Sequence, residues 1–138
     1  APLAAAHRAP RFAQPPRARQ PPRAAATAAT QAGAMAKIGF LGAGNMAEAL
    51  MKGFVGAGLT SWGHISASDV YQPRLDVMTS LGAACRANSE MAAHADTIFV
   101  AVKPGQVAGV LAEIAPTLDQ SRHVLVSIAA GVTIETLE

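Results

Sequence analysis

The chain has 138 residues, of which 51% are hydrophobic and 14% charged, which suits one buried core and leaves little length for a second domain. No run of about 18 apolar residues is free of charge, so we expect no membrane-spanning helix and no membrane partner. A single cysteine, Cys85, excludes an internal disulfide and a cysteine-based metal site, and the four histidines are not spaced as metal ligands. The composition therefore predicts one globular domain without a metal.

The positive charge is concentrated near the start of the chain. The isoelectric point is about 9.1, yet five of the eleven Lys and Arg residues lie in residues 1–34, a segment without any Asp or Glu. Residues 35–138 carry the other six together with all nine acids. Because this larger part is mildly acidic, it lacks the basic face that docks onto a phosphate backbone. We therefore expect no nucleic-acid partner.

Residues 1–34 are rich in Ala, Pro and Arg. We expect them to be disordered, because they offer few bulky side chains to bury. An arginine-rich segment without acids ahead of a globular domain is typical of an organelle transit peptide, which would direct the protein to a plastid or mitochondrion. The alternative is an unstructured extension of a cytoplasmic protein, with Met35 as a second candidate start. The composition places the domain boundary between residues 34 and 35 and leaves the compartment open.

From residue 37 onward, apolar runs of strand composition alternate with helical periodicities. Strands are predicted at residues 37–41, 64–69, 83–86, 97–102 and 123–128, and helices at 46–57, 73–81, 88–95 and 106–118. Pro73 and Gly82 mark the ends of the second helix, and Asn88 or Ser89 is expected to cap the third. Strands that alternate with crossover helices predict an α/β fold, a Rossmann-like doubly wound parallel sheet.

A glycine-rich turn follows the first predicted strand and opens the first helix. Its sequence, Gly-Ala-Gly-Asn-Met-Ala, fits the G-x-G-x-x-A pattern of dinucleotide-binding turns, although a purely structural glycine turn is the alternative. Gly42 permits the sharp turn, Gly44 lets a pyrophosphate approach the backbone, and Ala47 allows helix and strand to pack closely. The unpaired N–H groups of the helix start would bind the diphosphate. The candidate residues are Gly42, Ala43, Gly44, Asn45, Met46 and Ala47.

Asp69 stands at the end of the second predicted strand, 27 positions after Gly42. This is near the roughly 20-residue separation at which an acid meets the adenosine ribose. Its carboxylate would bind the 2′-hydroxyl of NAD and repel the 2′-phosphate of NADP, whereas Ser66, Ser68 and Arg74 are candidates to bind that phosphate. The alternative is that Asp69 caps the next turn. The residues alone leave the choice of cofactor open.

Two later segments also end strands and would reach the same crevice, because the carboxyl ends of parallel strands meet at one edge. Lys103 emerges from the fourth strand next to Pro104, where it would face the cofactor unless it is a solvated loop lysine. The fifth strand ends in small residues around Ala129 and Ala130, which would let a flat ring lie against the backbone.

Three of these stretches, taken in order, resemble the pyrroline-5-carboxylate reductases. Residues 38–50 look like that family's opening strand, turn and helix. Residues 101–104 and 127–134 look like its two later cofactor-lining segments, at the family's spacing. The first stretch alone would also suit the β-hydroxyacid dehydrogenases, but all three together favour the reductase. The resemblance runs from residue 37 to the end of the chain.

The resemblance implies roles for particular residues. The glycine turn would hold the pyrophosphate, Asp69 would lie on the ribose side, and Asn88 would touch the cofactor. The nicotinamide would be bordered by Ala101, Val102, Lys103, Pro104, Ile128, Ala129 and Ala130. The family's usual cofactor is NADPH. Some members have serine where this chain has Asp69, so NADH is the alternative here. The implied reaction is hydride transfer to the C=N carbon of 1-pyrroline-5-carboxylate, a small-molecule substrate, to give L-proline in the last step of proline biosynthesis.

The resemblance also implies a helical dimerisation domain that grips the substrate and would begin beyond Glu138. We therefore name no catalytic residue, and we expect these 138 residues to bind the cofactor weakly without turnover. A homo-oligomer is expected only for the complete enzyme. Two alternatives stay open: a stand-alone NAD(P)-binding regulatory module, and a fragment of a β-hydroxyacid-type dehydrogenase. The module would explain the glycine turn but not the two nicotinamide-side segments.

Overall fold

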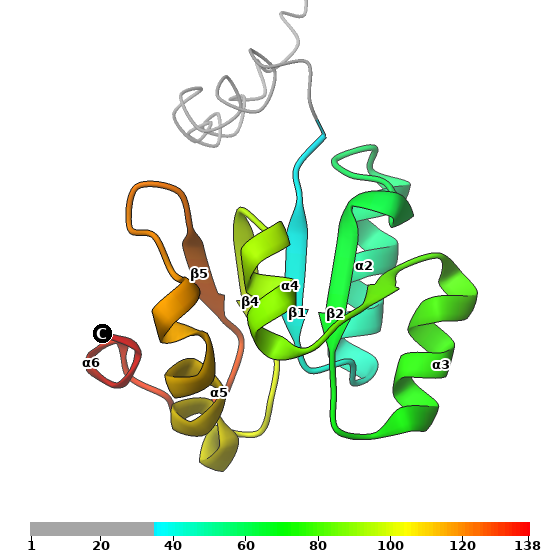
Figure 1. The fold of residues 1–138 in the computed structure, drawn as a ribbon. Coiled ribbons are helices and arrows are strands. Elements are labelled where there is room, and N and C mark those ends of the chain that lie inside the picture. Colours follow the sequence, from blue (N-terminus) through cyan, green and yellow to red (C-terminus); the bar gives the residue numbers. More distant parts are fainter. Residues whose placement is uncertain (1–34) are drawn as a thin grey trace, which may run out of the picture.

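The computed structural model describes residues 35–138, so the predictions made for residues 1–34 lie outside the described residues. Five strands form one sheet: β1 (Ile38–Leu41), β2 (Ile65–Ser68), β3 (Ala84–Cys85), β4 (Thr97–Val100) and β5 (Val124–Ser127). All neighbouring strands are parallel and their order is β3-β2-β1-β4-β5. The chain winds outward from β1 to β3, then crosses back to β4 on the other side of β1 (Figure 1). The predicted Rossmann-like doubly wound sheet is confirmed.

Helices cover both faces of this sheet. They are α2 (Asn45–Gly56), α3 (Gln72–Leu81), α4 (Asn88–His94), α5 (Val107–Ile114) and the short α6 (Ile134–Leu137). On one face, Met51 of α2 and Met78 of α3 pack in a core with Phe40. On the other face, Met91 of α4 and Val107 of α5 pack in a second core with Leu41. The result is a three-layer arrangement with β1 at its centre (Figure 1).

The central strand β1 is buried along its whole length. Its alternate side chains serve the two cores, because successive residues of a strand point to opposite faces. The Phe40 ring stacks on Phe99 of the adjacent β4, with ring centroids 5.1 Å apart. On the other face, a Cβ added at Gly39 would overlap the Sδ of Met91, so α4 packs directly on the β1 backbone. Close packing of this kind fixes where the chain leaves β1 and enters the glycine turn.

Several predicted boundaries differ from the structure. The predicted strand at residues 97–102 ends at Val100, and the predicted helix at 106–118 is divided into the 3-10 turn η2 (Pro104–Gln106), α5 and the 3-10 turn η3 (Ala115–Thr117). Pro116 explains the second break, because a proline inside an α-helix lacks the N–H group and clashes with the preceding turn. The N-cap of α4 is Ala87, without a side-chain hydrogen bond, so the predicted cap at Asn88 or Ser89 is wrong.

Two further observations concern classes of function. None of the helices described for residues 35–138 is long and apolar enough to cross a membrane. Within the same residues, no three His, Cys, Asp or Glu side chains lie close enough together to hold a metal ion.

Cys85 is half-buried, with its Sγ 3.3 Å from the carbonyl oxygen of Leu75, to which it donates a hydrogen bond.

Candidate functional site

A cavity of about 830 Å³ opens beside the carboxyl ends of β1, β2 and β4. These ends lie at the lower edge of the sheet in Figure 1, where the winding direction reverses between β1 and β4. Ligands of open α/β sheets bind at such a reversal. Seven of the predicted cofactor-binding residues line the cavity: Gly42, Gly44, Asp69, Asn88, Ala101, Val102 and Lys103.

Gly42 is required by the backbone for two reasons. Its φ angle of 98° lies in the left-handed region, where an L side chain is strained. A Cβ at this position would also lie 2.6 Å from the backbone oxygen of Ala101. The Gly42 N–H donates a 2.8 Å hydrogen bond to the oxygen of Ser68. The glycine therefore holds the ends of β1, β2 and β4 together, a structural role in addition to any contact with a ligand.

Gly44, in contrast, faces open space. It is the N-cap of α2, its φ is −72°, and a Cβ added there would meet nothing within 4 Å. The first intrahelical bond runs from the N–H of Glu48 to the oxygen of Gly44, so the N–H groups of Asn45 and Met46 have no partner within the helix. These groups and the helix dipole favour an anion at this end of α2. A side chain at Gly44 would occupy the space through which a diphosphate approaches the backbone.

The two alanines of the glycine turn have a packing role. Ala47 is fully buried and belongs to the core between α2 and the sheet. Ala43 is fully buried too, whereas Met46 is 66% exposed. Ala43, Asn45, Met46 and Ala47 do not line the cavity with the residues named above. Their contact with a cofactor stays a prediction. The free N–H groups at the start of α2 support it.

Asp69 follows β2 directly and its carboxylate accepts two backbone hydrogen bonds. One oxygen, Oδ2, accepts from the N–H of Ala43 at 2.7 Å, and the other, Oδ1, accepts from the N–H of Tyr71 at 2.9 Å. The contact with Tyr71 confirms that Asp69 caps the next turn. The contact with Ala43 joins it to the glycine turn, which the sequence did not indicate. Asp69 also lines the cavity, which supports its predicted place beside a ribose. That place stays a prediction.

Arg74 of α3 links three parts of the site. Its Nε donates to the backbone oxygen of Ala43 at 2.6 Å, and its Nη2 lies 2.6 Å from Oε2 of Glu48 in α2. Lys52 pairs with the other oxygen of Glu48 at 2.6 Å. The hydrogen bond from Lys52, followed by that from Arg74, holds the pKa of the Glu48 carboxyl below its usual value. Arg74 is thereby fixed at the cavity wall with its charge only partly compensated.

The other candidates for binding a phosphate are placed differently. Ser68 lines the cavity but is buried, and its hydroxyl donates a 3.4 Å hydrogen bond to the oxygen of Phe40. Ser66 is buried as well and lines a separate cavity. Of the three residues proposed from the sequence, only Arg74 combines a place at this cavity with unused N–H donors.

The segment after β4 forms the opposite wall. The N–H of Ala101 donates to the oxygen of Leu41 at 2.8 Å, which prolongs the pairing with β1 by one residue. Lys103 is exposed and forms no ion pair with any residue of the described chain. Pro104 begins η2 and lies outside the lining. Ile128, Ala129 and Ala130 follow β5, one strand further away, and do not line the cavity either.

Four polar residues that line the cavity were not singled out by the sequence: Tyr71, Arg86, Gln106 and Glu113. Arg86 directly follows β3, so the rule that sites gather at the carboxyl ends of strands could have identified its position. Glu113 lies inside α5 and carries no local signal. Its Oε2 accepts a 2.5 Å hydrogen bond from the side-chain amide of Asn88, which orients that amide at the cavity.

Comparison with protein families and curated sequences gives consistent relatives. The family described as NADP oxidoreductase, coenzyme F420-dependent, matches residues 37–131. The chain is 41% identical over 104 residues to pyrroline-5-carboxylate reductase 2 of Homo sapiens, covering 73% of this chain and 32% of that protein. It is 42% identical over 106 residues to pyrroline-5-carboxylate reductase of Escherichia coli (strain K12), covering 73% and 38%. The chain thus spans about a third of the length of these curated relatives.

Solved structures similar to this chain include a pyrroline-5-carboxylate reductase, a pyrroline carboxylate reductase and an imine reductase. A pyrroline-5-carboxylate reductase from Coxiella burnetii is similar with a TM-score of 0.70 at 28% identity, over 75% of this chain and 39% of that one. A pyrroline carboxylate reductase from Plasmodium falciparum with NADP bound is similar with a TM-score of 0.64 at 31% identity, over 75% and 38%. An imine reductase from Myxococcus stipitatus, at 24% identity and a TM-score of 0.61 over 71% and 33%, shares the fold.

Proposed function

The chain belongs to the family described as NADP oxidoreductase, coenzyme F420-dependent, and we propose that it forms the dinucleotide-binding part of a reductase. The fold is that of an NAD(P)-dependent oxidoreductase. The proposed reaction is the reduction of 1-pyrroline-5-carboxylate to L-proline. Its support is the shared naming of curated relatives about 40% identical in sequence from an animal and a bacterium.

One observation carries the proposal: the open backbone of Gly44 at the start of α2, facing a cavity of about 830 Å³. A structural turn requires Gly42, whose Cβ would clash, but it does not require Gly44, whose Cβ would stand free. A glycine there is explained by a ligand that approaches the backbone. A diphosphate suits the site, since the N–H groups and the dipole of α2 point toward it.

Bound NAD(P)H would supply the hydride, and the described residues would bind and orient it. The turn from Gly42 to Ala47 would hold the diphosphate, and the backbone from Ala101 to Lys103 would border the ring on the opposite wall. Hydride transfer requires the ring carbon and the imine carbon to be held close and aligned, which accounts for much of the rate in such reactions. None of the described residues is assigned as the acid for the imine nitrogen.

For the cofactor, NADPH is favoured over NADH. Both oxygens of Asp69 already accept backbone hydrogen bonds, so the carboxylate is less available to a ribose 2′-hydroxyl than its position alone suggests. Arg74 stands at the same cavity with part of its guanidinium unpaired among the described residues. A guanidinium suits a phosphate, because it offers charge and several donors in one plane.

The proposal is tested by assaying the complete protein and the 138-residue chain side by side. The complete protein is expected to oxidise NADPH only when 1-pyrroline-5-carboxylate is present and to form L-proline in equal amount. The 138-residue chain is expected to bind the cofactor without turnover. Cofactor binding without any turnover by the complete protein would instead favour a regulatory module, and oxidation of a β-hydroxyacid would favour the other alternative.

A further inference from the structure

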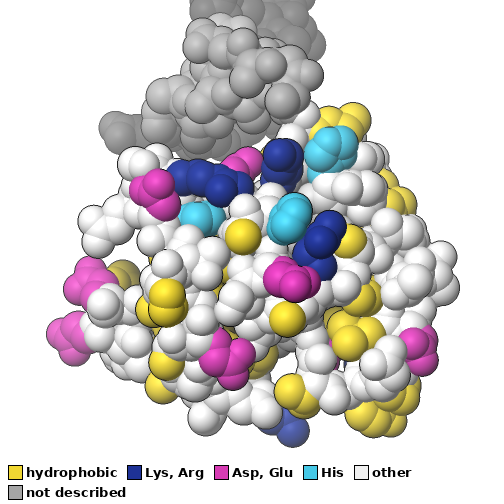
Figure 2. All heavy atoms as spheres, in the orientation of Figure 1, with side chains coloured by type: hydrophobic (Ala, Val, Ile, Leu, Met, Phe, Trp, Pro, Cys, Tyr) yellow, Lys and Arg dark blue, Asp and Glu magenta, His cyan; other side chains and the backbone are white. Residues whose placement is uncertain are grey.

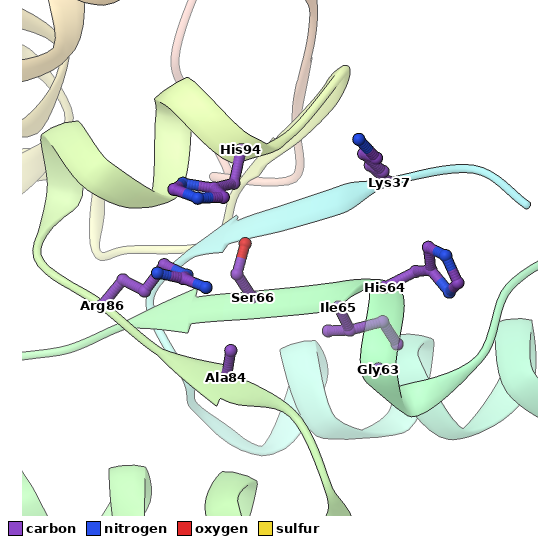
Figure 3. Close-up of a pocket in the computed structure, with 8 residues that line it drawn as sticks. All are labelled: Lys37, Gly63, His64, Ile65, Ser66, Ala84, Arg86 and His94. Carbon is purple, nitrogen blue, oxygen red and sulfur yellow. The ribbon is translucent and has the colours of Figure 1, made fainter.

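A second, smaller cavity lies away from the candidate dinucleotide site. It measures about 110 Å³ and is found on the α4 side of the sheet, where β1, β2 and β3 begin. Figure 2 shows Lys, Arg and His side chains gathered at the upper side of this face of the molecule. The charged and polar lining is formed by Lys37, His64, Ser66, Arg86 and His94, drawn as sticks in Figure 3.

The charged and titratable side chains of the lining are all basic. Four of its side chains are Lys, Arg or His, and no Asp or Glu is among the lining residues. The ion pairs of the described residues use Lys52, Arg74 and Arg122, so neither Lys37 nor Arg86 is neutralised within residues 35–138. A volume several times the roughly 30 Å³ of one liquid water admits a small ion but excludes a dinucleotide.

Arg86 gives a specific sign of a missing partner. Its Nε is buried and has no hydrogen-bond acceptor among the described residues. A buried N–H on a charged group without an acceptor costs free energy, and such groups are normally paired. In Figure 3 the guanidinium of Arg86 and the hydroxyl of Ser66 point into the same space beneath the His94 ring. An acceptor in that space would meet the Nε–H of Arg86, which has no acceptor among the described residues.

The two histidines indicate which acceptor fits. Nδ1 of His94 lies 2.8 Å from the backbone oxygen of Glu90, so this nitrogen carries a proton. In the neutral ring Nε2 is then an acceptor. Hydrogen phosphate, like the monoanion of a phosphomonoester, offers oxygens to Arg86 and a P–OH proton to Nε2, whereas sulfate offers only oxygens. Nδ1 of His64 lies 2.8 Å from the hydroxyl oxygen of Ser61, and in Figure 3 His64 and Lys37 lie at the other end of the lining from Arg86.

We propose that this cavity binds the phosphate group of a small ligand, either inorganic phosphate or a phosphomonoester. The site is distinct from the glycine turn and shares with the larger cavity only Arg86, which lines both. It goes beyond the proposed reductase activity, because neither hydride transfer nor cofactor binding requires an anion at the amino ends of the strands.

The test is a titration of the ¹⁵N-labelled 138-residue chain, followed by amide NMR at constant ionic strength. Sodium phosphate is expected to give saturable shifts at Ser66, Arg86 and His94, while chloride gives none. Sulfate is expected to bind more weakly than phosphate. Arg86→Gln is expected to weaken phosphate binding about ten-fold, since it removes charge-assisted hydrogen bonds. The matched control Lys52→Gln makes the same charge change on α2, on the opposite face, and leaves the affinity unchanged.

Lys37→Gln provides a second variant if Arg86→Gln does not fold, because Lys37 is exposed and its loss leaves no buried group unpaired. It is expected to weaken phosphate binding several-fold. A parallel titration with glycerol 2-phosphate distinguishes the sources: tighter binding than phosphate at the same residues identifies a phosphomonoester, and weaker binding identifies the free ion. Shifts confined to residues 42–47, equal affinity for sulfate, or unchanged affinity in both variants would overturn the proposal.

Discussion

The carboxylate of Asp69 accepts a 2.7 Å hydrogen bond from the backbone N–H of Ala43, which ties the end of β2 to the glycine turn that follows β1. Its other oxygen caps the turn at Tyr71. Arg74 reinforces the same link from α3 through the backbone oxygen of Ala43. The shape of the proposed diphosphate site thus depends on side chains of the next strand and helix, as well as on the glycines themselves.

Asp69 is predicted to affect both stability and cofactor choice. Asp69→Ala removes two hydrogen bonds to a charged acceptor and should lower the free energy of unfolding by about 2 kcal/mol, measured by urea denaturation. Asp69→Asn keeps one of the two acceptor oxygens and removes the charge near a 2′-phosphate. Because two charges about 4 Å apart in water interact by about 1 kcal/mol, the preference for NADPH over NADH should rise about five-fold. The control is Asp76→Asn, an exposed acid on α3. An unchanged preference in Asp69→Asn would remove Asp69 from the ribose side.

Substitutions at Gly42 and Gly44 are predicted to affect different properties: the first lowers stability, and the second weakens NADPH binding. Gly42→Ala forces a left-handed φ and a clash with the Ala101 backbone, and should cost about 3 kcal/mol of stability. Gly44→Ala stands in open space and should change stability by less than about 1 kcal/mol. It should nevertheless weaken NADPH binding about ten-fold or more, because the diphosphate loses its approach to the backbone. Thermal denaturation and calorimetric titration measure the two effects. Equal NADPH affinity in Gly44→Ala and the natural chain would contradict this role.

Alanine substitutions at two other glycines should change the free energy of unfolding in opposite directions. Gly39→Ala introduces a methyl group that overlaps Met91 and Ala95, so we expect a loss of about 1–3 kcal/mol as α4 is pushed from the sheet. Gly53→Ala lies inside α2 with no atom near its Cβ, so the higher helix propensity of alanine should stabilise the chain by about 1 kcal/mol. Midpoints of urea unfolding compare them. Destabilisation by Gly53→Ala would show that α2 does not pack as described.

The pair Glu48–Arg74 is predicted to make stability depend on pH in the acid range. Lys52 and Arg74 lower the pKa of Glu48 in the folded chain below its ordinary value of 4.5, so the folded state binds fewer protons there than the unfolded state. The stabilising contribution is therefore fully present above about pH 4.5 and lost as the pH falls through the lower folded pKa. Glu48→Gln should destabilise at neutral pH and have a smaller effect at about pH 3. Glu90→Gln, an exposed acid without an ion pair among the described residues, is the control. An equal effect of Glu48→Gln at both pH values would contradict the pairing.

The sequence predicted the fold well where the information is local. Gly42 and Gly44 between an apolar strand and a helix identify the turn, and the alternation of strands and helices identifies the parallel sheet. Asp69 could be placed at the end of β2 for the same reason. These features depend on backbone geometry over a few residues, which the sequence expresses directly.

Contacts between distant elements were not predictable. Asn88 has the right chemistry for a helix cap, but its amide reaches Glu113 of α5, 25 residues later. The hydrogen bond from Ala43 to Asp69 spans 26 residues and has no sequence signature. Ala129 was expected near the crevice because its residue type suits a flat ring; its strand, β5, lies one place beyond β4 and Ala129 does not line the cavity, so its contact with a cofactor stays a prediction. Such outcomes depend on how the sheet is ordered and how the helices pack on it.

The glycine turn and the segment after β4 are proposed to bind a nicotinamide dinucleotide in the same cavity. The most direct measurement is a titration of NADPH into the ¹⁵N-labelled 138-residue chain, with the shifts mapped onto the sequence. Saturable shifts are expected at Gly42, Gly44 and Asn45 together with Ala101 and Lys103, all of them lost in Gly44→Val. No saturable binding by the folded chain, or binding that Gly44→Val leaves unchanged, would contradict it.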